Sequence, residues 1–354
     1  MSRENLSFRL AERPHDNIIP GKTFKQVREP APTADNLKDG EILVESLYLS
    51  LDPAMRGWLN DSRSYLPPVG IDEVMRGITI SRVLASKNPS VKTGDLVTAA
   101  IGWQEVGIVA PPNFERVDVP AGGRPVDAIG VLGLTGLTAY FGLSKIGLPQ
   151  PGETVVVSGA AGATGSVAGQ IAKLRGAKRV VGIAGTDEKC RWLTEELGFD
   201  AAVNYKSATF AKDLAAATPD FVDVYWDNVG GAILDAVLPR AAQRARFVMC
   251  GSISGYNNPG KGAAGGGVRN LWALTAQRVR MEGFIIFDYA SEFAAARAEI
   301  AQWLAEGKIK RKETVVKGGL QEADKAILKL FDGSNMGKLL VEVKPFEVGG
   351  SFRL

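Results

Sequence analysis

The stretch from Thr154 to Gly185 constrains the fold of this chain more than any other segment does. It reads TVVVSGAAGATGSVAGQIAKLRGAKRVVGIAG, which is an apolar run, a glycine turn, a run of small residues and a second apolar run. Val167, Ile171 and Leu174 are spaced so that they share one face of a helix between the two apolar runs. A strand, a helix and a second strand in this order predict a βαβ unit of a parallel sheet.

The same alternation continues through the middle of the chain. Helical spacing separates most of the strand-like runs, as at Leu193 and Leu197. We therefore expect an α/β protein whose central part is a doubly wound parallel sheet. A glycine-rich segment at 260–270 is expected to be a mobile loop. The strand-like runs lie at 154–158, 179–184, 201–204, 221–226, 244–250 and 280–286.

Both ends of the chain carry a different pattern. Short strand-like runs broken by Gly, Pro and Asp dominate the first part, and a helical segment at 291–307 precedes two more strand-like runs. We interpret the tail as returning to the first domain. The expected domains are residues 1–130 with 308–354, and residues 131–307. The strand-like runs outside the central part lie at 40–52, 77–86, 94–103, 312–317 and 338–344.

The composition argues against several classes of protein. The 354 residues are 45% hydrophobic and 23% charged, which is ordinary for a globular protein and sufficient for two cores. The net charge of +3 is too small to predict a nucleic-acid surface, and the basic run at 308–312 is typical of a solvated face. No apolar run approaches the roughly 18 residues of a membrane helix. Cys190 and Cys250 make no disulfide framework, so we expect a reduced, cytoplasmic location.

The histidine count limits the chemistry. The chain has one histidine, His15. A catalytic zinc needs about three protein ligands from Cys, His and carboxylates, and neither CxxC nor HxxxH spacing occurs. A serine hydrolase would have to use His15, and no G-x-S-x-G elbow is present. We therefore expect no metal, and a chemistry that relies on a cofactor, tyrosines, backbone groups or carboxylates.

The glycine turn predicts a dinucleotide site. From Ala160 the segment reads A-x-G-x-x-G, a variant of the dinucleotide fingerprint. Glycine lets the backbone approach a pyrophosphate, and the following helix offers free N–H groups and the positive end of its dipole. A purely structural glycine turn is the alternative, but the strand before it and the helix after it favour a dinucleotide.

The second strand of the unit, at 179–184, is followed by no acidic residue at its tip. An NAD-preferring site has Asp or Glu there to bind the ribose 2′-OH, and a carboxylate would repel the 2′-phosphate of NADP. Thr186 is expected to cap a helix whose first turn holds Asp187 and Glu188. Lys189 lies near the same helix start, where the dipole disfavours a cation. A solvated surface lysine is the alternative, but together with the missing acid Lys189 favours NADP.

These motifs give the chain a resemblance to a known family. It resembles the zinc-free medium-chain dehydrogenase/reductases, in the group of prostaglandin reductases, plant double-bond reductases and bacterial curcumin reductases. The resemblance implies an N-terminal GroES-like β domain, a Rossmann domain and NADPH-dependent reduction of a C=C bond conjugated to a carbonyl. Many relatives carry an aromatic residue where this chain has Ala54. The matching segments are SLDPAMRGWL (50–59), LGLTGLTAYFGL (132–143), residues 158–189, NYK (204–206), DNVGG (227–231), CGSISGYN (250–257), RMEGF (280–284) and NMGK (335–338).

The resemblance also assigns roles to residues. It implies that the glycine turn lies at the pyrophosphate, that Lys189 and Tyr205 bind the 2′-phosphate, and that Phe284–Ile286 and Asn335 complete the nicotinamide end. Asn228 and the segment 250–256 would line the ribose and nicotinamide. The implied cofactor-binding residues are Ala161, Gly162, Ala163, Thr164, Lys189, Tyr205, Asn228, Cys250, Gly251, Ser252, Ile253, Ser254, Gly255, Tyr256, Phe284, Ile285, Ile286 and Asn335.

Tyrosines are the candidates for the chemistry. Hydride transfer to the β-carbon of an enone leaves negative charge on the carbonyl oxygen, and a neutral tyrosine hydroxyl is a suitable donor. Tyr256 follows a parallel strand at its carboxyl end, where such sheets bind ligands, so we expect it to be the catalytic residue. Packing of its ring on the cofactor is the alternative. Met55, Arg56 and Tyr65 are expected to face the substrate, and a structural ion pair is the alternative for Arg56.

Two other hypotheses stay open. A quinone reductase of the same superfamily would differ in substrate and share the cofactor. A low-turnover NADPH-binding protein would instead serve a structural purpose. We expect a homodimer that acts on a small enone or enal and has no nucleic-acid or membrane partner.

Overall fold

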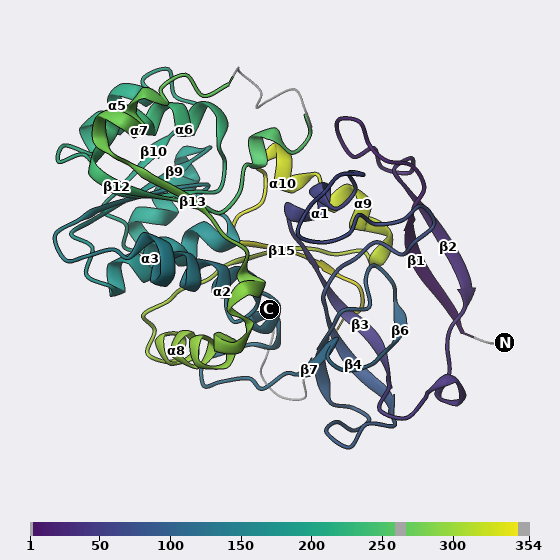
Figure 1. Ribbon diagram of the computed structural model, residues 1–354. Coiled ribbons are helices and arrows are strands. Elements are labelled where there is room, and N and C mark those ends of the chain that lie inside the picture. Colours follow the sequence, from purple (N-terminus) through teal and green to yellow (C-terminus); the bar gives the residue numbers. More distant parts are fainter. Residues whose placement is uncertain (1–2, 259–266, 346–354) are drawn as a thin grey trace. The chain divides into compact units, whose positions relative to one another are not determined.

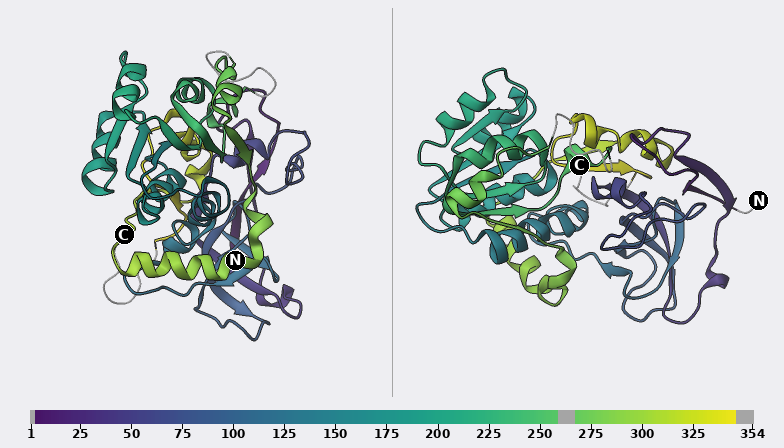
Figure 2. Two further views of the ribbon diagram at one scale, coloured as in Figure 1. Left: turned by 60° about the vertical axis from the view of Figure 1, so that its left-hand side comes forward. Right: turned by 45° about the horizontal axis from the view of Figure 1, so that its top comes forward.

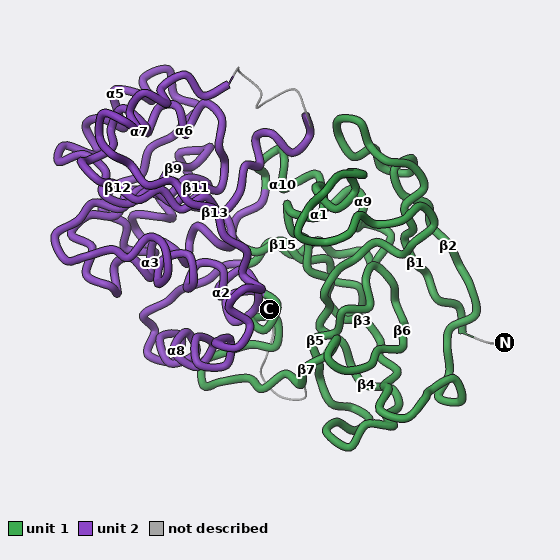
Figure 3. The backbone as a smooth tube through the Cα atoms, in the orientation of Figure 1, with its two compact units in different colours: residues 1–129, 313–334, 338–354 green, residues 130–312, 335–337 purple. Residues whose placement is uncertain are grey.

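A computed structural model describes residues 3–258 and 267–345. The chain forms two compact units, which Figure 3 shows in two colours. Unit 1 comprises residues 1–129, 313–334 and 338–354, and unit 2 comprises residues 130–312 and 335–337. The expected domain boundaries differ from these at residue 130 and by short segments at 308–312 and 335–337. The glycine-rich segment expected to be a mobile loop lies largely outside the described residues.

Unit 2 contains a sheet of six strands in the order β10-β9-β8-β11-β12-β13, and all neighbours are parallel (Figure 1). Numbered along the chain within this unit, the order is 3-2-1-4-5-6, that of a Rossmann fold. The predicted α/β class with a doubly wound parallel sheet is confirmed. The strands are β8 (Thr154–Ser158), β9 (Arg179–Ala184), β10 (Ala201–Asn204), β11 (Val222–Asp227), β12 (Ala241–Met249) and β13 (Arg280–Gly283).

Helices cover both faces of this sheet (Figures 1 and 2). Val155 and Val157 of β8 pack in one hydrophobic cluster with α2, α3 and α8, whereas Val156 packs in another with α5, α6 and α7. The small residues of α3 allow close packing, since a Cβ atom at Gly169 would lie 1.9 Å from the ring of Phe199. The helices are α2 (Leu134–Phe141), α3 (Ala163–Leu174), α4 (Asp187–Arg191), α5 (Phe210–Ala217), α6 (Gly231–Val237), α7 (Trp272–Gln277) and α8 (Phe293–Ala305).

Unit 1 is built around strand β3 (Ile42–Leu51), all ten residues of which are buried. A seven-stranded sheet follows the order β14-β15-β3-β4-β5-β7, and β6 pairs with β3 off this path. The late strands β14 (Glu313–Val316) and β15 (Lys338–Glu342) belong to it, so the tail does join the sheet of the first part. The N-terminal β domain is thereby confirmed. The other elements are β1 (Glu4–Leu10), β2 (Phe24–Pro30), α1 (Ala54–Gly57), β4 (Thr79–Ser86), β5 (Leu96–Ala99), β6 (Val106–Val109), β7 (Phe114–Arg116), α9 (Ala323–Ala326) and α10 (Lys329–Asp332).

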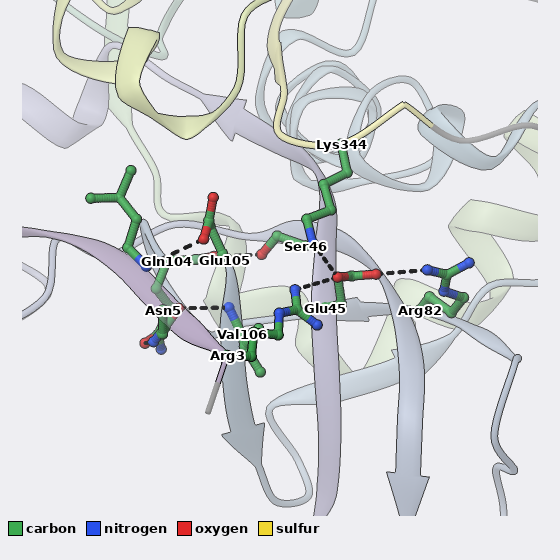
Figure 4. Close-up of polar contacts among 10 residues, drawn as sticks. Arg3, Asn5, Glu45, Ser46, Arg82, Gln104, Glu105, Val106 and Lys344 are labelled. Carbon is green, nitrogen blue, oxygen red and sulfur yellow. Dashed lines mark hydrogen bonds and ion pairs between the residues drawn. The ribbon is translucent and has the colours of Figure 1, made fainter. Parts of the chain in front are cut away.

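A buried carboxylate on β3 ties three parts of unit 1 together (Figure 4). Glu45 is 3% exposed and forms ion pairs with Arg3 near the N-terminus, Arg82 on β4 and Lys344 after β15. The Arg82 guanidinium lies 2.7 Å from Oε2 of Glu45. Burial alone would raise the pKa of this carboxyl, but the bonds from Lys344, Arg82 and Arg3 outweigh it and lower the pKa to about 2. The charge of Glu45 is therefore part of how this unit is held together.

No helix in the described part of the chain is both long enough and apolar enough to cross a bilayer.

Candidate active site

The sheet of unit 2 has a topological switch point between β8 and β11. β9 and β10 extend the sheet on one side of this point, and β12 and β13 extend it on the other. Parallel sheets bind ligands at the carboxyl ends of the strands beside such a point. The structure brings the predicted cofactor residues of unit 2 to this edge. Tyr205 follows β10, Lys189 follows β9, residues 161–164 follow β8, Asn228 follows β11, residues 250–256 follow β12, and residues 284–286 follow β13.

The glycine turn after β8 presents backbone groups. Gly162 is the N-cap of α3, and no side chain caps the first turn of that helix. A Cβ atom at Gly165 would lie 2.4 Å from the carbonyl oxygen of Gly159, so glycine is required for the helix to start this close to the turn. Gly159 itself has φ +56°, in the left-handed region that favours glycine. The first N–H groups of α3 therefore have no side-chain cap, and such groups are suited to a pyrophosphate. That they bind one here stays a prediction.

A short segment from the end of the chain lies against this turn. The N–H of Gly337 donates to the carbonyl of Ala161 over 2.8 Å, and Gly337 and Gly162 form an isolated bridge. Asn335 is 9% exposed, and its amide donates to the carbonyl of Gly337. Gly337 thus holds this segment against the turn after β8, and the expected place of Asn335 at the nicotinamide end stays a prediction.

The end of β9 is covered by an aromatic ring. A Cβ atom at Gly185 would lie 3.0 Å from the ring of Tyr205, so this ring packs over the glycine. Tyr205 is 41% exposed, and the ammonium group of Lys206 lies 5.9 Å from its ring centre. This end of the sheet thus presents a hydroxyl group and a cation, which suit a phosphate better than a ribose diol.

The start of α4 forms as the sequence predicts. Thr186 is the N-cap, and its hydroxyl accepts a hydrogen bond from the N–H of Lys189 over 3.2 Å. Asp187 stands in the first turn, where its carboxylate accepts a hydrogen bond from the Asn204 amide over 2.8 Å. Asn204 also binds the N–H of Lys206, so one amide fixes both the first turn of α4 and the chain after β10.

The loop after β12 folds back onto the turn after β11. The N–H groups of Cys250 and Gly251 donate to the carbonyl of Asp227, and the N–H of Ile253 donates to the carbonyl of Asn228. The hydroxyl of Ser254 donates to the carbonyl of Val229 over 2.6 Å. The predicted residues of these two segments therefore form one connected surface at the carboxyl edge.

The hydroxyl of Tyr256 is held within that loop. The N–H of Ser252 donates to the Tyr256 hydroxyl oxygen over 3.1 Å. A Cβ atom at Gly251 would lie 2.9 Å from the same oxygen, so the phenol crosses directly over this glycine. Tyr256 is half-buried, and its hydroxyl thus has a fixed place beside the ends of β11 and β12.

The rings of Trp226 and Phe284 form an aromatic wall next to Asn228. The indole N–H of Trp226 donates to Oδ1 of Asn228 over 3.0 Å, and the amide of Asn228 donates to the carbonyl of Ser158 over 2.7 Å. The ring of Phe284 meets Trp226 edge to face, with ring centres 6.0 Å apart. A Cβ atom at Gly142 would lie 2.4 Å from the Trp226 ring, which fixes that ring from the other side. Ile285 and Ile286 are half-buried after β13.

A buried carboxylate lies at the switch point itself, and sequence reasoning assigned it no function. Asp227 is 0% exposed at the end of β11. Its Oδ1 accepts from the hydroxyl groups of Ser158 and Tyr225, over 2.9 and 3.0 Å, and from the N–H groups of Val229 and Gly230, over 2.9 and 2.8 Å. Burial raises the pKa of Asp227, and these four bonds offset part of that rise. The DNVGG segment, a carboxylate directly after an apolar strand, was the signal available in the sequence.

The predicted substrate residues belong to unit 1. Met55 and Arg56 lie in α1 and are 1% and 0% exposed. The guanidinium of Arg56 donates to the carbonyls of Pro14 and Asp16 and to the Asn60 side chain. These bonds suit a structural role, and the expected contact of Arg56 with the substrate stays a prediction. These contacts fasten α1 to the N-terminal segment that contains His15.

Tyr65, also in unit 1, is 44% exposed. The indole N–H of Trp58 donates to its hydroxyl oxygen over 2.9 Å. Of the three predicted substrate residues, Tyr65 alone has a side chain that is open to solvent.

The thiols and acids of the described residues do not suggest nucleophilic or metal chemistry. Both cysteines are free, and burial raises the pKa of each thiol, that of Cys250 to about 12, with a contribution from Asp227. Each thiol is therefore protonated near neutral pH. Within residues 3–258 and 267–345, no three His, Cys, Asp or Glu side chains are grouped so that they could hold a metal ion.

The edge of a Rossmann sheet with this set of groups defines a dinucleotide-dependent oxidoreductase, and comparison with known proteins narrows the class. The model described as the N-terminal domain of oxidoreductases matches residues 7–117, and the model described as zinc-binding dehydrogenase matches residues 163–302. The NADPH-dependent curcumin reductase of Escherichia coli is 40% identical over 96% of this chain and 97% of that protein. The NADP-dependent 2-alkenal reductase of Nicotiana tabacum is 39% identical over 86% of this chain and 87% of that protein.

A solved structure agrees with these relatives. CurA from Vibrio vulnificus in complex with NADPH has a TM-score of 0.87 and 41% identity, covering 96% of this chain and 99% of that chain. The chain therefore belongs to the zinc-free medium-chain dehydrogenase/reductase family, in the group of the curcumin, alkenal and prostaglandin reductases. It is an oxidoreductase.

Proposed function

We propose that this protein reduces the C=C bond of α,β-unsaturated ketones or aldehydes, with hydride delivered to the β-carbon. The observation that carries the proposal is the close relationship, over nearly the whole chain, to enzymes named for curcumin and for 2-alkenals. A 2-alkenal has a C=C bond next to its carbonyl, which is the arrangement that accepts hydride at the β-carbon. The carboxyl edge of unit 2 supplies groups that fit this chemistry.

The cofactor is NADPH, which supplies the hydride when bound. The N–H groups at the start of α3 bind its pyrophosphate, next to Gly162. Lys189 and Tyr205 bind the 2′-phosphate at the ends of β9 and β10. Gly185 and Thr186 bring no carboxylate to that position, and the Asp187 carboxylate is engaged by Asn204.

Tyr256 is proposed to assist the chemical step. When hydride reaches the β-carbon, negative charge develops on the carbonyl oxygen, and a preorganised donor stabilises it. The bond from the N–H of Ser252 fixes the Tyr256 oxygen over Gly251, at the edge where Asn228 and the aromatic wall line the nicotinamide position. Tyr65 is the second candidate donor, because its hydroxyl is also held by a hydrogen bond.

The proposal is tested by NADPH consumption with matched acceptors. An open-chain enone and an enal should both oxidise NADPH, whereas the corresponding saturated ketone and aldehyde should not. A quinone reductase would consume NADPH with quinones alone. Tight NADPH binding without turnover of any acceptor would indicate the structural protein instead. Either of the last two results contradicts the proposal.

The enone or enal as substrate, the homodimer and the cytoplasmic location expected from the sequence remain predictions.

A further inference from the structure

Asp227 joins three segments that face the cofactor position. Through Oδ1 it binds Ser158 at the end of β8 and the N–H groups of Val229 and Gly230 in the turn after β11. Through its carbonyl it binds the N–H groups of Cys250 and Gly251 at the start of the Tyr256 loop. One residue therefore connects the end of β8, the Asn228 turn and the 250–256 loop.

Asn228 is positioned through the same network. Its backbone N–H donates to the Ser158 hydroxyl over 2.9 Å, and that hydroxyl donates to Asp227. Its amide binds the Ser158 carbonyl, and its Oδ1 receives the Trp226 indole N–H. The orientation of Asn228 thus depends on a chain of bonds that ends at the Asp227 carboxyl group.

The two oxygens of this carboxyl group have different surroundings. Oδ1 accepts four hydrogen bonds, all from neutral donors, whereas the buried Oδ2 has no hydrogen-bond partner. No lysine, arginine or histidine among the described residues forms an ion pair with Asp227. An isolated buried charge is costly. These surroundings therefore suit a carboxyl group that acts as a hydrogen-bond acceptor better than one that acts through its charge.

We propose that Asp227 is a positioning residue for the nicotinamide end of the site, acting through Oδ1 as a hydrogen-bond acceptor and not through its charge. Its effect on the hydride step rests on the proposed function, but its effect on cofactor binding does not. Without this acceptor, four donors lose their partner at once, and the Asn228 turn loses the bonds that fix it. The backbone carbonyl of residue 227 still holds the start of the 250–256 loop, but the turn against which that loop folds is no longer fixed.

The first test compares Asp227→Ala with Asp227→Asn, using the dissociation constants of NADPH and NADH from cofactor fluorescence. Asp227→Ala should weaken both cofactors alike by about tenfold or more, since the nicotinamide end is common to both. Asp227→Asn keeps the acceptor oxygen and should stay within about threefold of the wild type. Wild-type affinity in Asp227→Ala, or an equal loss in the two variants, would overturn the proposal.

Asp324 offers a matched control for the loss of a buried carboxylate. It is 3% exposed in unit 1, its Oδ2 accepts the N–H of Gly21 over 2.9 Å, and its Oδ1 has no partner. Asp324→Ala should lower the melting temperature and leave both dissociation constants as in the wild type. If Asp324→Ala weakened the cofactors as much as Asp227→Ala, the effect would reflect general destabilisation, and positioning by Asp227 would be refuted.

Ser158→Ala supplies a second variant should Asp227→Ala fail to fold. It removes only the hydroxyl that links Asp227 to the Asn228 backbone. It should weaken NADPH and NADH alike by about threefold to tenfold. Unchanged affinity for both would count against the network.

A stereochemical readout separates positioning from stability. Wild-type enzyme should transfer deuterium to an enone from one face of C4 of labelled NADPH only. Ser158→Ala and Asp227→Ala should transfer measurably from both faces, and retention of a single face in both would contradict the proposal. If the wild type reduced no enone at all, the proposed function would fail while the binding measurements still tested Asp227.

Discussion

Glu45 in unit 1 and Asp227 in unit 2 are both buried carboxylates on central strands, yet their surroundings are opposite. Glu45 is bound by three cations, Arg3, Arg82 and Lys344 (Figure 4). Asp227 is bound by two hydroxyl groups and two backbone N–H groups. The pKa of Glu45 is lowered to about 2, whereas burial raises that of Asp227.

The two carboxylates contribute to the protein in different ways. The side chains of Arg3, Arg82 and Lys344 are 36–45% exposed, so they lose little hydration when they pair with Glu45. The charge of Glu45 therefore holds β3, β4 and the segments around Arg3 and Lys344 together. Neutral donors instead fix the shape of the ligand-binding edge around Asp227. Changes in unit 1 near Glu45 should therefore alter stability and not catalysis, whereas changes at the edge of unit 2 should alter cofactor binding or catalysis.

The largest effect is expected from Tyr256→Phe. Loss of a donor used mainly in the transition state should lower kcat and kcat/KM together by roughly tenfold to a thousandfold. The change also removes the acceptor of the Ser252 N–H. Because this is a single hydrogen bond within the loop, NADPH affinity should change only slightly. Steady-state kinetics with an enone and cofactor titration measure both quantities.

Tyr140→Phe is the matched control for this change. It removes a hydroxyl that donates to Glu299 over 2.6 Å, in the same unit. It should leave kcat as in the wild type. A Tyr256→Phe enzyme with the wild-type rate would show that Tyr256 is not the donor, and Tyr65 would become the candidate.

Glu45→Gln should have the largest effect on stability. A carboxyl whose folded pKa, about 2, lies below the ordinary 4.5 stabilises the protein above pH 4.5, and this contribution is lost as the pH falls toward 2. Because solvent screens the partly exposed cations, the loss at neutral pH should be on the order of 2 kcal/mol. Denaturant unfolding should show the difference from wild type narrowing as the pH falls below 4.5.

Glu29→Gln serves as the control, because Glu29 is 53% exposed and pairs with Arg9 on the surface of the same unit. It should change the free energy of unfolding by less than about 1 kcal/mol. NADPH affinity should be unaffected by either variant. A Glu45→Gln protein as stable as Glu29→Gln at neutral pH would refute a fastening role for the Glu45 charge.

Lys189→Ala should affect the cofactor and not the fold. It should cost about 1–3 kcal/mol of NADPH affinity, the range for bonds to a charged group, and leave NADH nearly unchanged. Lys178→Ala, at the other end of β9 and paired with Asp220, should change neither. Equal losses for NADPH and NADH in Lys189→Ala would show that Lys189 does not bind the 2′-phosphate.

The smallest effect is expected from metal removal. With one histidine in the chain and no paired ligand spacings, chelators should leave the rate unchanged, and metal analysis should find no stoichiometric zinc. Bound zinc that followed activity through purification would contradict this expectation.

The sheet of unit 2 was predictable because its strands carry their signal locally. Apolar runs bounded by turns gave β8, β9 and β10 with the bounds that the structure has, and the Thr186 cap is also as predicted. The expected family, fold class and NADP cofactor agree with the comparisons. Strands β1, β2, β6 and β7 were missed. β6 and β7 have only four and three residues, and β2 is mostly exposed with a sequence, FKQVREP, that lacks an apolar pattern.

The site was less predictable, because its contacts join distant parts of the sequence. Ser158 and Asp227 are separated by 69 positions, and no local pattern shows that their side chains meet. Arg56 likewise donates to the Asp16 carbonyl, 40 positions away, so its burial could not be inferred from the DPAMR motif. The roles of the predicted site residues stay predictions that the variants above address.

Hydride delivery to the β-carbon of a conjugated carbonyl can be tested by following the hydride itself. The purified protein would be given an open-chain enone and NADPH deuterated at the transferred position of C4, and the product analysed by NMR. We expect a saturated ketone with deuterium on the β-carbon and with the proton at the α-carbon taken from solvent. Deuterium on the carbonyl carbon, in an allylic alcohol that keeps its C=C bond, would contradict it.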